Sequence, residues 1–421
     1  MPALHDPPAS GARSLTIESV GAQGDGRAKE NGVWVNVPFT LAGETVRVEG
    51  AGERLTLLEV LTPSPERAAP ACRHFGTCGG CTLQHMSAAS YSAFKRDQIV
   101  RALSARGLEA DVVEAWITPP ASRRRAAFTA KRAGKQVALG FHARRSHELV
   151  AISECPVTRP AIVAALPRLK EIAGHLLPGK DGVGLLVTET AAGLDLHITG
   201  LAKEVKALAR AEAASAALRA GFARVSIDGA DVLTERRPSL PAGTANLLPP
   251  PGGFLQASAE AEAEMARLVL AHLKGAAAVA DLFSGCGTFS LRLAAEASVL
   301  AAEGDAAAIE ALKASVRAAY GLKPVTAEVR DLFRNPYGAA ELSHLDGLAL
   351  DPPRAGAAAQ VAEIAKSRVP KLAYVSCDPA TLARDLRTLV DGGYRIIRIH
   401  PIDQFLWSAH VEAVALLEKT P

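Results

Sequence analysis

The chain has 421 residues, of which 48% are hydrophobic and 22% are charged, and its formal net charge at pH 7 is +3. This length exceeds what one hydrophobic core ordinarily supports and indicates two or three domains. No stretch has the length of a membrane span, and residues 1–15 lack the apolar core of a signal peptide, so we expect a cytoplasmic protein with no membrane partner. Because the net charge is small, a nucleic-acid partner must be argued from local patches.

The first segment, from Ser14 to Val60, predicts a small β domain. Short alternating runs at 15–18, 33–37, 45–48 and 55–60 are separated by stretches rich in glycine. Several short strands with such turns indicate a small OB-like barrel, a shape that binds nucleic acid in many proteins. A barrel that only caps the neighbouring domain fits the pattern equally well. We place this domain at residues 13–62.

Four cysteines in the next segment have the pattern of a metal site. Cys72, Cys78 and Cys81 are clustered, and Cys155 follows in a Ser-Glu-Cys-Pro sequence. In a cytoplasmic chain such a cluster indicates metal or redox chemistry more than disulfides. Four thiolates bind either a tetrahedral zinc ion or an iron-sulfur cluster, and the spacing alone does not separate the two. We expect this site in a central α+β domain, residues 63–250.

The same segment contains the strongest run of basic residues in the chain. No acidic residue occurs from Ala121 to Arg145, and the basic residues of this run are Arg123, Arg124, Arg125, Lys131, Arg132, Lys135, Arg144 and Arg145. A solvated face is the usual meaning of such a run. Its position on strand-like segments beside the cysteines favours contacts with phosphate groups.

The second half, residues 251–421, has the pattern of an α/β domain. A strand from Ala277 to Phe283 leads into the sequence Ser-Gly-Cys-Gly-Thr-Phe, after which a helix begins. Such glycines let a ligand approach the backbone, and a helix N-terminus favours polar or anionic groups. The next strand ends at Glu303, where such folds bind the two hydroxyls of a ribose. The spacing therefore favours a nucleoside-containing cofactor, either a dinucleotide or S-adenosylmethionine.

Three later segments bring reactive groups toward the same edge of the sheet. One strand ends in Asp351-Pro-Pro-Arg, another ends in Ser-Cys377-Asp-Pro, and a polar loop that contains His410 precedes a strand that opens with Glu412. Ligands bind in the crevice outside the carboxyl ends of the strands in open α/β sheets. A Cys377 thiolate could meet a substrate there. Glu412, or His410 as the alternative, is the candidate base at the same place.

These segments, taken in order, resemble the S-adenosylmethionine-dependent RNA uracil-C5 methyltransferases. The motifs that carry the resemblance are Gly253 to Gln256, Asp281 to Leu291, Asp351 to Arg354, Ser376 to Leu382 and His410 to Glu412. The match covers nearly the whole chain and implies a Rossmann-like methyltransferase domain. It implies that Cys377 is the nucleophile and Glu412 the general base. The contacts to S-adenosylmethionine that it implies are Gln256, Phe283, Thr288, Glu303, Asp331 and Asp351.

The N-terminal half resembles one branch of this family. The spacing of the four cysteines is similar to that of the branch that holds a [4Fe-4S] cluster, and residues 13–62 look like a TRAM domain. Both features resemble the branch that acts on 23S ribosomal RNA. The resemblance therefore implies an enzyme that makes 5-methyluridine in 23S rRNA, with a tRNA uracil-C5 methyltransferase as the alternative, and we expect it to be a monomer.

The chain departs from the family at two positions. Thr288 stands where Asn is usual, which could alter a cofactor contact, and Asp378 stands where Asn is expected. A carboxylate at Asp378 could raise the pKa of the neighbouring Cys377 thiol.

Two other functions fit parts of the sequence. Amino-group methyltransferases also use an Asp-Pro-Pro turn, but they normally place an aromatic residue next, where this chain has Arg354, and they need no Cys377. An RNA-binding iron-sulfur protein that has kept a methyltransferase scaffold is disfavoured, because both candidate catalytic groups are present.

Overall fold

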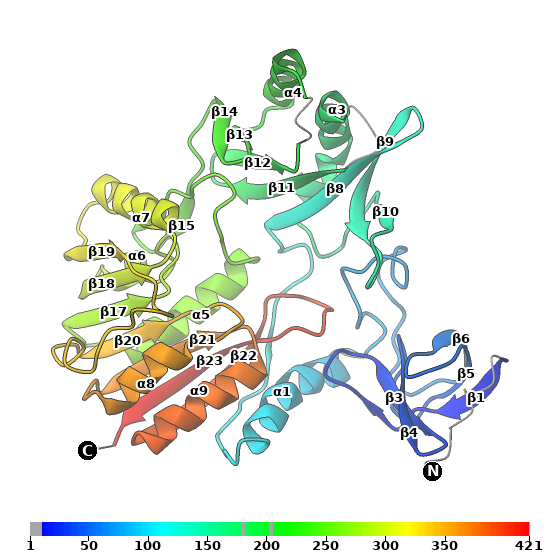
Figure 1. Ribbon diagram of the computed structural model, residues 1–421, viewed down its shortest axis with the longest axis horizontal. Coiled ribbons are helices and arrows are strands. Elements are labelled where there is room, and N and C mark those ends of the chain that lie inside the picture. The colour runs from blue at the N-terminus through cyan, green and yellow to red at the C-terminus, as the bar shows by residue number, and fades with distance from the viewer. Residues whose placement is uncertain (1–10, 178–181, 202–204, 421) are drawn as a thin grey trace, which may run out of the picture.

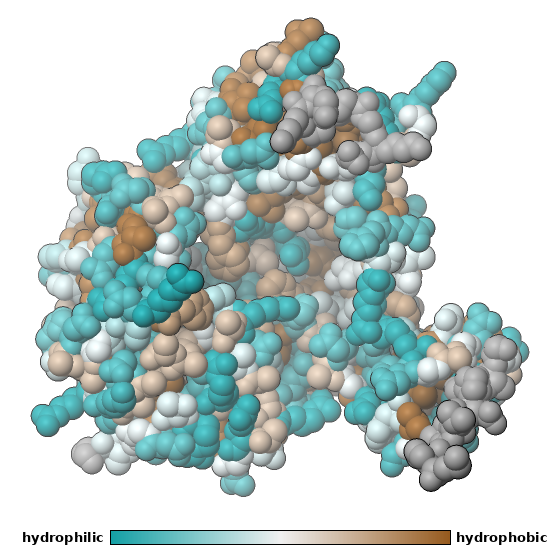
Figure 2. All heavy atoms as spheres, viewed as in Figure 1, coloured by the Kyte–Doolittle hydropathy of each residue, from teal (hydrophilic) through white to brown (hydrophobic). Residues whose placement is uncertain are grey.

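The computed structural model describes residues 11–177, 182–201 and 205–420. In Figure 1 these residues form three parts: small sheets near the N-terminus, a larger central sheet, and an α/β sheet built mainly from the C-terminal half. A space-filling view shows the surface hollowed where the three parts meet (Figure 2). Among the described residues, none of the helices combines the length and the apolar composition that a membrane span requires.

The N-terminal part consists of two three-stranded antiparallel sheets. One contains β1 (Arg13–Thr16), β5 (Thr45–Glu49) and β6 (Thr56–Thr62), and the other contains β2 (Ser19–Val20), β3 (Gly26–Glu30) and β4 (Val33–Val37). Their inward-facing side chains share one small core, which contains Ile17, Ala28, Val35, Val37, Val46, Val48 and Leu55. The alternation that predicted strands here arises because one face of each strand covers this core.

The central part is a seven-stranded sheet with helices packed on it, as expected for an α+β domain. Its strand order is β10-β9-β8-β11-β12-β13-β14. The strands are β8 (Arg125–Ala133), β9 (Gln136–His142), β10 (Leu149–Ala151), β11 (Val183–Thr190), β12 (Gly193–Thr199), β13 (Arg224–Ile227) and β14 (Ala230–Thr234). The helices α2 (Pro160–Ala164), α3 (Leu166–Leu176) and α4 (Ala207–Arg219) share a hydrophobic core with these strands.

The C-terminal half forms an eight-stranded mixed sheet of order β19-β18-β17-β20-β21-β23-β22-β7. Its strands are β17 (Ala278–Leu282), β18 (Ser298–Glu303), β19 (Val325–Val329), β20 (Gly347–Leu350), β21 (Lys371–Ser376), β22 (Tyr394–Asp403) and β23 (Glu412–Lys419), with β7 (Trp116–Ile117) at the edge. The pairs from β19 to β21 are parallel, and β23 is antiparallel to both of its neighbours. The helices of this half are α5 (Ala259–His272), α6 (Ser290–Leu293), α7 (Ala306–Ala318), α8 (Ala358–Lys366) and α9 (Pro379–Asp391), and a hairpin of β15 (Leu240–Ala242) and β16 (Ala245–Leu247) precedes them.

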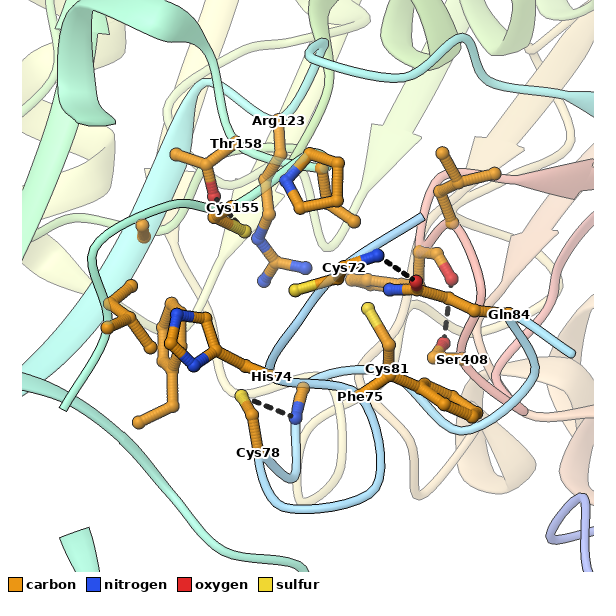
Figure 3. A pocket seen from close by; sticks show the side chains of 18 of the residues that line it. Cys72, His74, Phe75, Cys78, Cys81, Gln84, Arg123, Cys155, Thr158 and Ser408 are labelled. Carbon is orange, nitrogen blue, oxygen red and sulfur yellow. Dashed lines mark hydrogen bonds between the residues drawn. The ribbon is translucent and has the colours of Figure 1, made fainter. Parts of the chain in front are cut away.

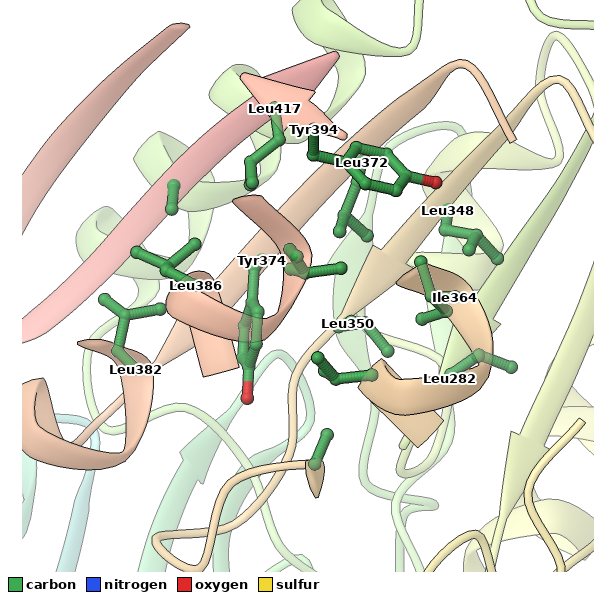
Figure 4. Packing of buried hydrophobic residues seen from close by; sticks show 14 of the residues in the cluster. Leu282, Leu348, Leu350, Ile364, Leu372, Tyr374, Leu382, Leu386, Tyr394 and Leu417 are labelled. Atoms are coloured by element: carbon green, nitrogen blue, oxygen red, sulfur yellow. The ribbon is translucent and has the colours of Figure 1, made fainter. Parts of the chain in front are cut away.

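The strands at the middle of this sheet are buried on both faces. Every residue of β20 is buried, as is every residue of β21 after Lys371, and such continuous apolar runs are typical of parallel strands covered on two sides. Figure 4 shows Leu350, Leu372 and Tyr374 of these strands among side chains of α8 and α9. The Tyr374 hydroxyl donates a hydrogen bond of 2.6 Å to Asp385 in α9. This packing fixes the ends of β20 and β21.

A helix from the first quarter of the chain packs with this C-terminal sheet. The helix α1 (Ala88–Ser104) begins after Ser87, whose side chain accepts a hydrogen bond from the Ser90 backbone N–H. Its residues Ile99 and Leu103 lie in the same hydrophobic core as β20 and β21, and α1 contacts α9 and β22 (Figure 1). The strand β7 pairs in parallel with the end of β22. The early segment is therefore part of the wall around the C-terminal sheet.

The predicted phosphate-binding surface does not hold for two arginines of the basic run. Arg124 is buried and donates a hydrogen bond to the Glu262 carboxylate in α5, and Arg144 pairs with Asp25 of the N-terminal part. These guanidinium groups neutralise carboxylates from other parts of the chain. A charged residue seldom lies inside a protein without such a partner, and the sequence does not reveal where that partner is.

Candidate active site

The carboxyl ends of the parallel strands β17, β18, β20 and β21 line a cavity of about 490 Å³. Its lining includes the predicted nucleophile, the preferred base and every predicted cofactor contact, but not the alternative base His410; these residues are Cys377, Glu412, Gln256, Phe283, Thr288, Glu303, Asp331 and Asp351. The lining also includes Arg354 and Phe405. The cavity thus brings together groups that are separated by more than a hundred residues of sequence.

One end of the cavity is formed by the turn that follows β17. Phe283 has a φ of 62° and Gly287 a φ of 100°, and a Cβ atom at Gly287 would lie 2.4 Å from the Leu312 side chain. Glycine is therefore required at 287 by both conformation and space. The Glu303 carboxylate accepts hydrogen bonds from the backbone N–H groups of Gly285 (3.1 Å) and Asp305 (3.0 Å), which hold it at the end of β18.

An exposed aromatic pair lies beside this turn. The rings of Phe283 and Phe333 are tilted against each other with centroids 5.4 Å apart, and both rings line the cavity. This geometry offers an apolar surface for a planar group beside the Glu303 carboxylate. Phe333 was not found from the sequence, although it follows the predicted contact Asp331 by only two positions.

A chain of buried amide and carboxyl groups crosses the cavity floor. Gln256 donates a hydrogen bond of 3.0 Å to Asp351, and Gln404 donates to both Gln256 (2.8 Å) and Glu412 (2.7 Å). The carbonyl oxygen of the Gln404 side chain accepts a hydrogen bond of 2.9 Å from the Ala257 backbone N–H. Gln404 was not found from the sequence, because its partners Gln256 and Ala257 lie more than 140 positions away.

Burial changes the proton affinity of both carboxyl groups in this chain. The pKa of Glu412 is raised to about 7 by burial, against the opposing effects of the Gln404 hydrogen bond and the positive charges of Arg354 and Lys95. The pKa of Asp351 is raised well above its usual range by burial and then by the nearby Glu412. A base works best when its pKa lies near the working pH, so Glu412 is suited to accept a proton near neutrality.

The Cys377 thiol follows β21 and is half-buried in the same cavity. Its pKa is raised to about 11 by burial and then by the carboxylates of Glu412 and Asp351, whereas Arg354 lowers it. Asp378 was expected to raise this pKa. Its side chain instead accepts hydrogen bonds from the N–H groups of Ala380 and Thr381 and caps α9, where the helix dipole favours its negative charge.

Arg354 connects the thiol to His410. Its guanidinium group lies 2.7 Å from Nδ1 of His410, and the pKa of this imidazole is lowered by burial and then by Arg354. Both ring nitrogens of His410 lie within 3.3 Å of this guanidinium group, and His410 is not among the residues that line the cavity of Cys377. This geometry favours Glu412 over His410 as the base.

The four predicted metal ligands line a second cavity of about 420 Å³ next to the first. Cys72, Cys78, Cys81 and Cys155 all lie on its wall, and Figure 3 shows the side chain of Arg123 reaching between them. Arg354 and Phe405 line both cavities, and the cavities are therefore adjacent. Within the part of the chain that the structure describes, no group of three or more His, Cys, Asp or Glu side chains is arranged to hold a metal ion.

The sequence is similar to those of known RNA methyltransferases. Residues 249–420 match the family model for tRNA (uracil-5-)-methyltransferases. A Caulobacter vibrioides protein described as an RNA methyltransferase is 49% identical over 97% of this chain and 100% of its own length. The 23S rRNA (uracil(1939)-C(5))-methyltransferase RlmD of Chromohalobacter salexigens is 35% identical over 97% of this chain and 90% of its own length.

The chain belongs to the RNA uracil-C5 methyltransferase family. The predicted family membership is thereby confirmed, and the chain is an RNA methyltransferase. The fold is also that of the family. The structure of tRNA (uracil-54, C5)-methyltransferase from Pyrococcus abyssi, in complex with S-adenosyl-L-homocysteine, superposes with a TM-score of 0.76 at 23% identity and covers 96% of this chain and 99% of that one.

The charges around Cys377 predict how fast its thiol reacts. At pH 8 iodoacetamide should alkylate Cys377 slowly, because its pKa is about 11. Replacing Arg354 by Gln removes a cation that favours the thiolate and slows alkylation. The change Glu412→Gln removes an anion that disfavours the thiolate and speeds alkylation, by about tenfold for each unit that the pKa moves. Mass spectrometry of the peptide that contains Cys377 measures the rate.

The control for this experiment is Arg317→Gln, which removes an exposed cation from α7. Arg317 does not line the cavity that contains Cys377. It should leave the alkylation rate unchanged. Equal rates in all four proteins would show that these charges do not set the reactivity of Cys377.

Proposed function

We propose that this enzyme transfers the methyl group of S-adenosylmethionine to C5 of a uridine in 23S rRNA, with Cys377 as nucleophile and Glu412 as base. The observation that carries the proposal is the placement of a thiol and a buried carboxyl group of raised pKa in one cavity at the carboxyl ends of the strands. Uracil C5 is a weak nucleophile toward a sulfonium methyl group. A thiolate that adds to C6 removes this difficulty.

The cofactor fits the end of the cavity near the turn after β17. Glu303 is placed to accept hydrogen bonds from ribose hydroxyls, and the Phe283 and Phe333 rings offer a surface for the adenine. Gln256, Thr288, Asp331 and Asp351 supply polar groups around the rest of the molecule. When bound, S-adenosylmethionine supplies an electrophilic methyl group.

The first step needs Cys377 as a thiolate, and Arg354 is the cation that favours it. The sulfur forms a bond to C6, and the electrons of the C5–C6 double bond move toward C5 and the O4 carbonyl. The alternative role of Arg354 is to bind this carbonyl oxygen through its guanidinium group. C5 would then form a bond to the methyl group while the bond between that group and the sulfonium sulfur breaks and leaves its electron pair on the sulfur. The uridine has to leave its stacked position to reach the cavity.

The second step restores the ring. Glu412 accepts the proton from C5, the electrons of that C–H bond re-form the C5–C6 double bond, and the sulfur leaves C6 as the Cys377 thiolate. A carboxylate with a pKa of about 7 is matched to this proton transfer at neutral pH. Gln404 holds the carboxylate in place through its 2.7 Å hydrogen bond.

Ribosomal RNA is the preferred substrate because the RlmD relative matches nearly the whole chain. The name of the family model and the Pyrococcus abyssi enzyme keep tRNA as the alternative. We assign residues 13–62 as a TRAM domain that contributes to RNA binding. Support comes from Trp34. The Arg27 guanidinium lies 4.4 Å and the Lys29 ammonium 5.0 Å from the centroid of its ring, so that one small surface offers both cations and an aromatic ring to RNA.

Replacing Glu412 by Gln should trap the reaction halfway. Addition of Cys377 and methyl transfer still proceed, but the C5 proton has no acceptor, and the sulfur stays bonded to C6. We therefore expect a covalent complex of enzyme and RNA that survives denaturing gel electrophoresis and carries the labelled methyl group.

The matched control is Cys377→Ala, which should form no adduct and no 5-methyluridine while still binding S-adenosylmethionine in a calorimetric titration. Methylation by the Ala variant at a comparable rate would disprove the nucleophile assignment. Free RNA and retained turnover in Glu412→Gln would assign the base to His410 or water.

We also propose that Cys72, Cys78, Cys81 and Cys155 hold a [4Fe-4S] cluster. Support comes from the four thiols, which all line one cavity, and from the resemblance of their spacing to that of the branch that holds such a cluster. Burial raises the pKa values of Cys72, Cys78 and Cys81, that of Cys81 to about 12, and charge on the neighbouring cysteines raises them further. Four thiolates would be stable here only with a cation between them.

Iron analysis tests this assignment. Protein purified without oxygen should contain about four iron and four sulfide ions per chain and should show the visible absorbance of such a cluster. The change Cys81→Ser should lower the iron content, whereas Cys286→Ser, at a buried cysteine on the wall of the other cavity, should not. Stoichiometric zinc without iron would overturn the cluster assignment.

A further inference from the structure

Three side chains on one face of α1 hold the loop that precedes Glu412. Tyr91, Lys95 and Gln98 are spaced four and three residues apart, a spacing that places them on one side of a helix. The Tyr91 hydroxyl donates a 2.6 Å hydrogen bond to Asp403, and the Gln98 amide donates a 2.7 Å hydrogen bond to the Ala409 carbonyl. The helix lies directly beside this loop and β22 (Figure 1).

Lys95 makes the central contacts of this face. Its side chain is 0% exposed, its ammonium group lies 2.8 Å from Asp403, and it donates a hydrogen bond to the His410 carbonyl. Glu412 follows His410 by two positions in the chain. The loop is also fixed at its middle, because the Trp407 N–H donates a 2.6 Å hydrogen bond to the Tyr91 oxygen.

Stability alone is a weak reason for this buried ion pair. Removing two charges from water is costly, and a buried pair can often be replaced by apolar side chains without loss of stability. Burial accordingly lowers the pKa of Lys95, and the negative charges of Asp403 and Glu412 oppose that effect. Packing therefore does not account for the buried ammonium group of Lys95, whereas the negative charges of Asp403 and Glu412 near it do.

The geometry points to Lys95 as a positioning residue for Glu412: it fixes the loop that leads into Glu412 at the start of β23 and supplies a positive charge on that side of the carboxylate. This inference rests on the proposed role of Glu412 as the base. It adds a residue from the first quarter of the chain to the machinery of the C-terminal half.

The charged and titratable groups around Glu412 come from several elements. Lys95 in α1 and Arg354 in the segment after β20 carry positive charges that favour the ionised carboxylate. Asp351 at the end of β20 and Cys377 at the end of β21 are the acidic neighbours, and the charge of Glu412 raises the pKa of each. With Lys95 removed, Arg354 is the cation that remains, and Glu412 should hold its proton up to a higher pH.

The test follows the decay of the covalent enzyme-RNA adduct during a single turnover, because that decay depends on proton removal from C5 and not on formation of the thiolate. In the wild-type protein the decay rate should rise with pH and level off above the pKa of Glu412, about 7. In Lys95→Met this rise should move upward by about one pH unit, the lower end of the effect of a nearby opposite charge. Decay at pH 7 should then be about fivefold slower, because the ionised fraction of Glu412 falls from about a half to about a tenth, and it should recover at high pH.

Matched controls separate charge from packing. Tyr91→Phe and Gln98→Leu each remove a hydrogen bond of the same helix face but leave its charge unchanged, and the pH at which decay levels off should not move. The double variant Lys95→Met/Asp403→Leu replaces the whole ion pair by apolar groups and guards against loss of folding in the single variant. It should show the same upward shift as Lys95→Met.

Two results would overturn the inference. One is a wild-type pH dependence of decay in both Lys95 variants, and the other is an equal slowing at every pH, which a purely structural role predicts. If the wild-type protein forms neither adduct nor 5-methyluridine, the proposed function itself has failed, and that outcome is recognised before any variant is compared.

Discussion

The buried carboxylate of Glu412 is the constraint around which the cavity is built. Glu412 is 4% exposed, and burial opposes its ionisation. A carboxylate in that position needs donors and cations close by, and no single element of the fold supplies them all. Gln404 comes from the end of β22, Arg354 from the end of β20, and Lys95 from α1. An early helix that packs on a late sheet through a shared hydrophobic core thus also supplies one of these charges.

The same arrangement joins the two cavities. The loop between β22 and β23 is bound on one side by α1 and on the other by the cysteine segment, where the N–H groups of Thr82 and Leu83 donate hydrogen bonds to the Trp407 carbonyl. Arg354 and Phe405 line both cavities. The segment that contains Cys81 is therefore bonded to the loop that leads into Glu412, and the two cavities share part of their walls.

Much of this could be predicted from the sequence, because the relevant signals are local. The strands that end at Glu303, Asp351 and Cys377 are short apolar runs followed by polar or rigid residues, and parallel strands bring such ends to one edge. Contacts between distant segments leave no comparable signal. The bonds from Lys95 to Asp403 and His410 join residues about three hundred positions apart, and Gln404 and Phe333 carry no motif of their own. The prediction for Arg124 in the basic run was wrong for the same reason, because its carboxylate partner, Glu262, lies 138 positions away.

We propose that the enzyme methylates uracil C5 of ribosomal RNA in this cavity. The most direct measurement supplies S-adenosylmethionine with a labelled methyl group to separate 23S rRNA and tRNA transcripts and then analyses the nucleosides. We expect label in 5-methyluridine from 23S rRNA alone. The same product from tRNA alone would contradict the choice of substrate, and label on another nucleoside, or on none, would contradict the roles of Cys377 and Glu412.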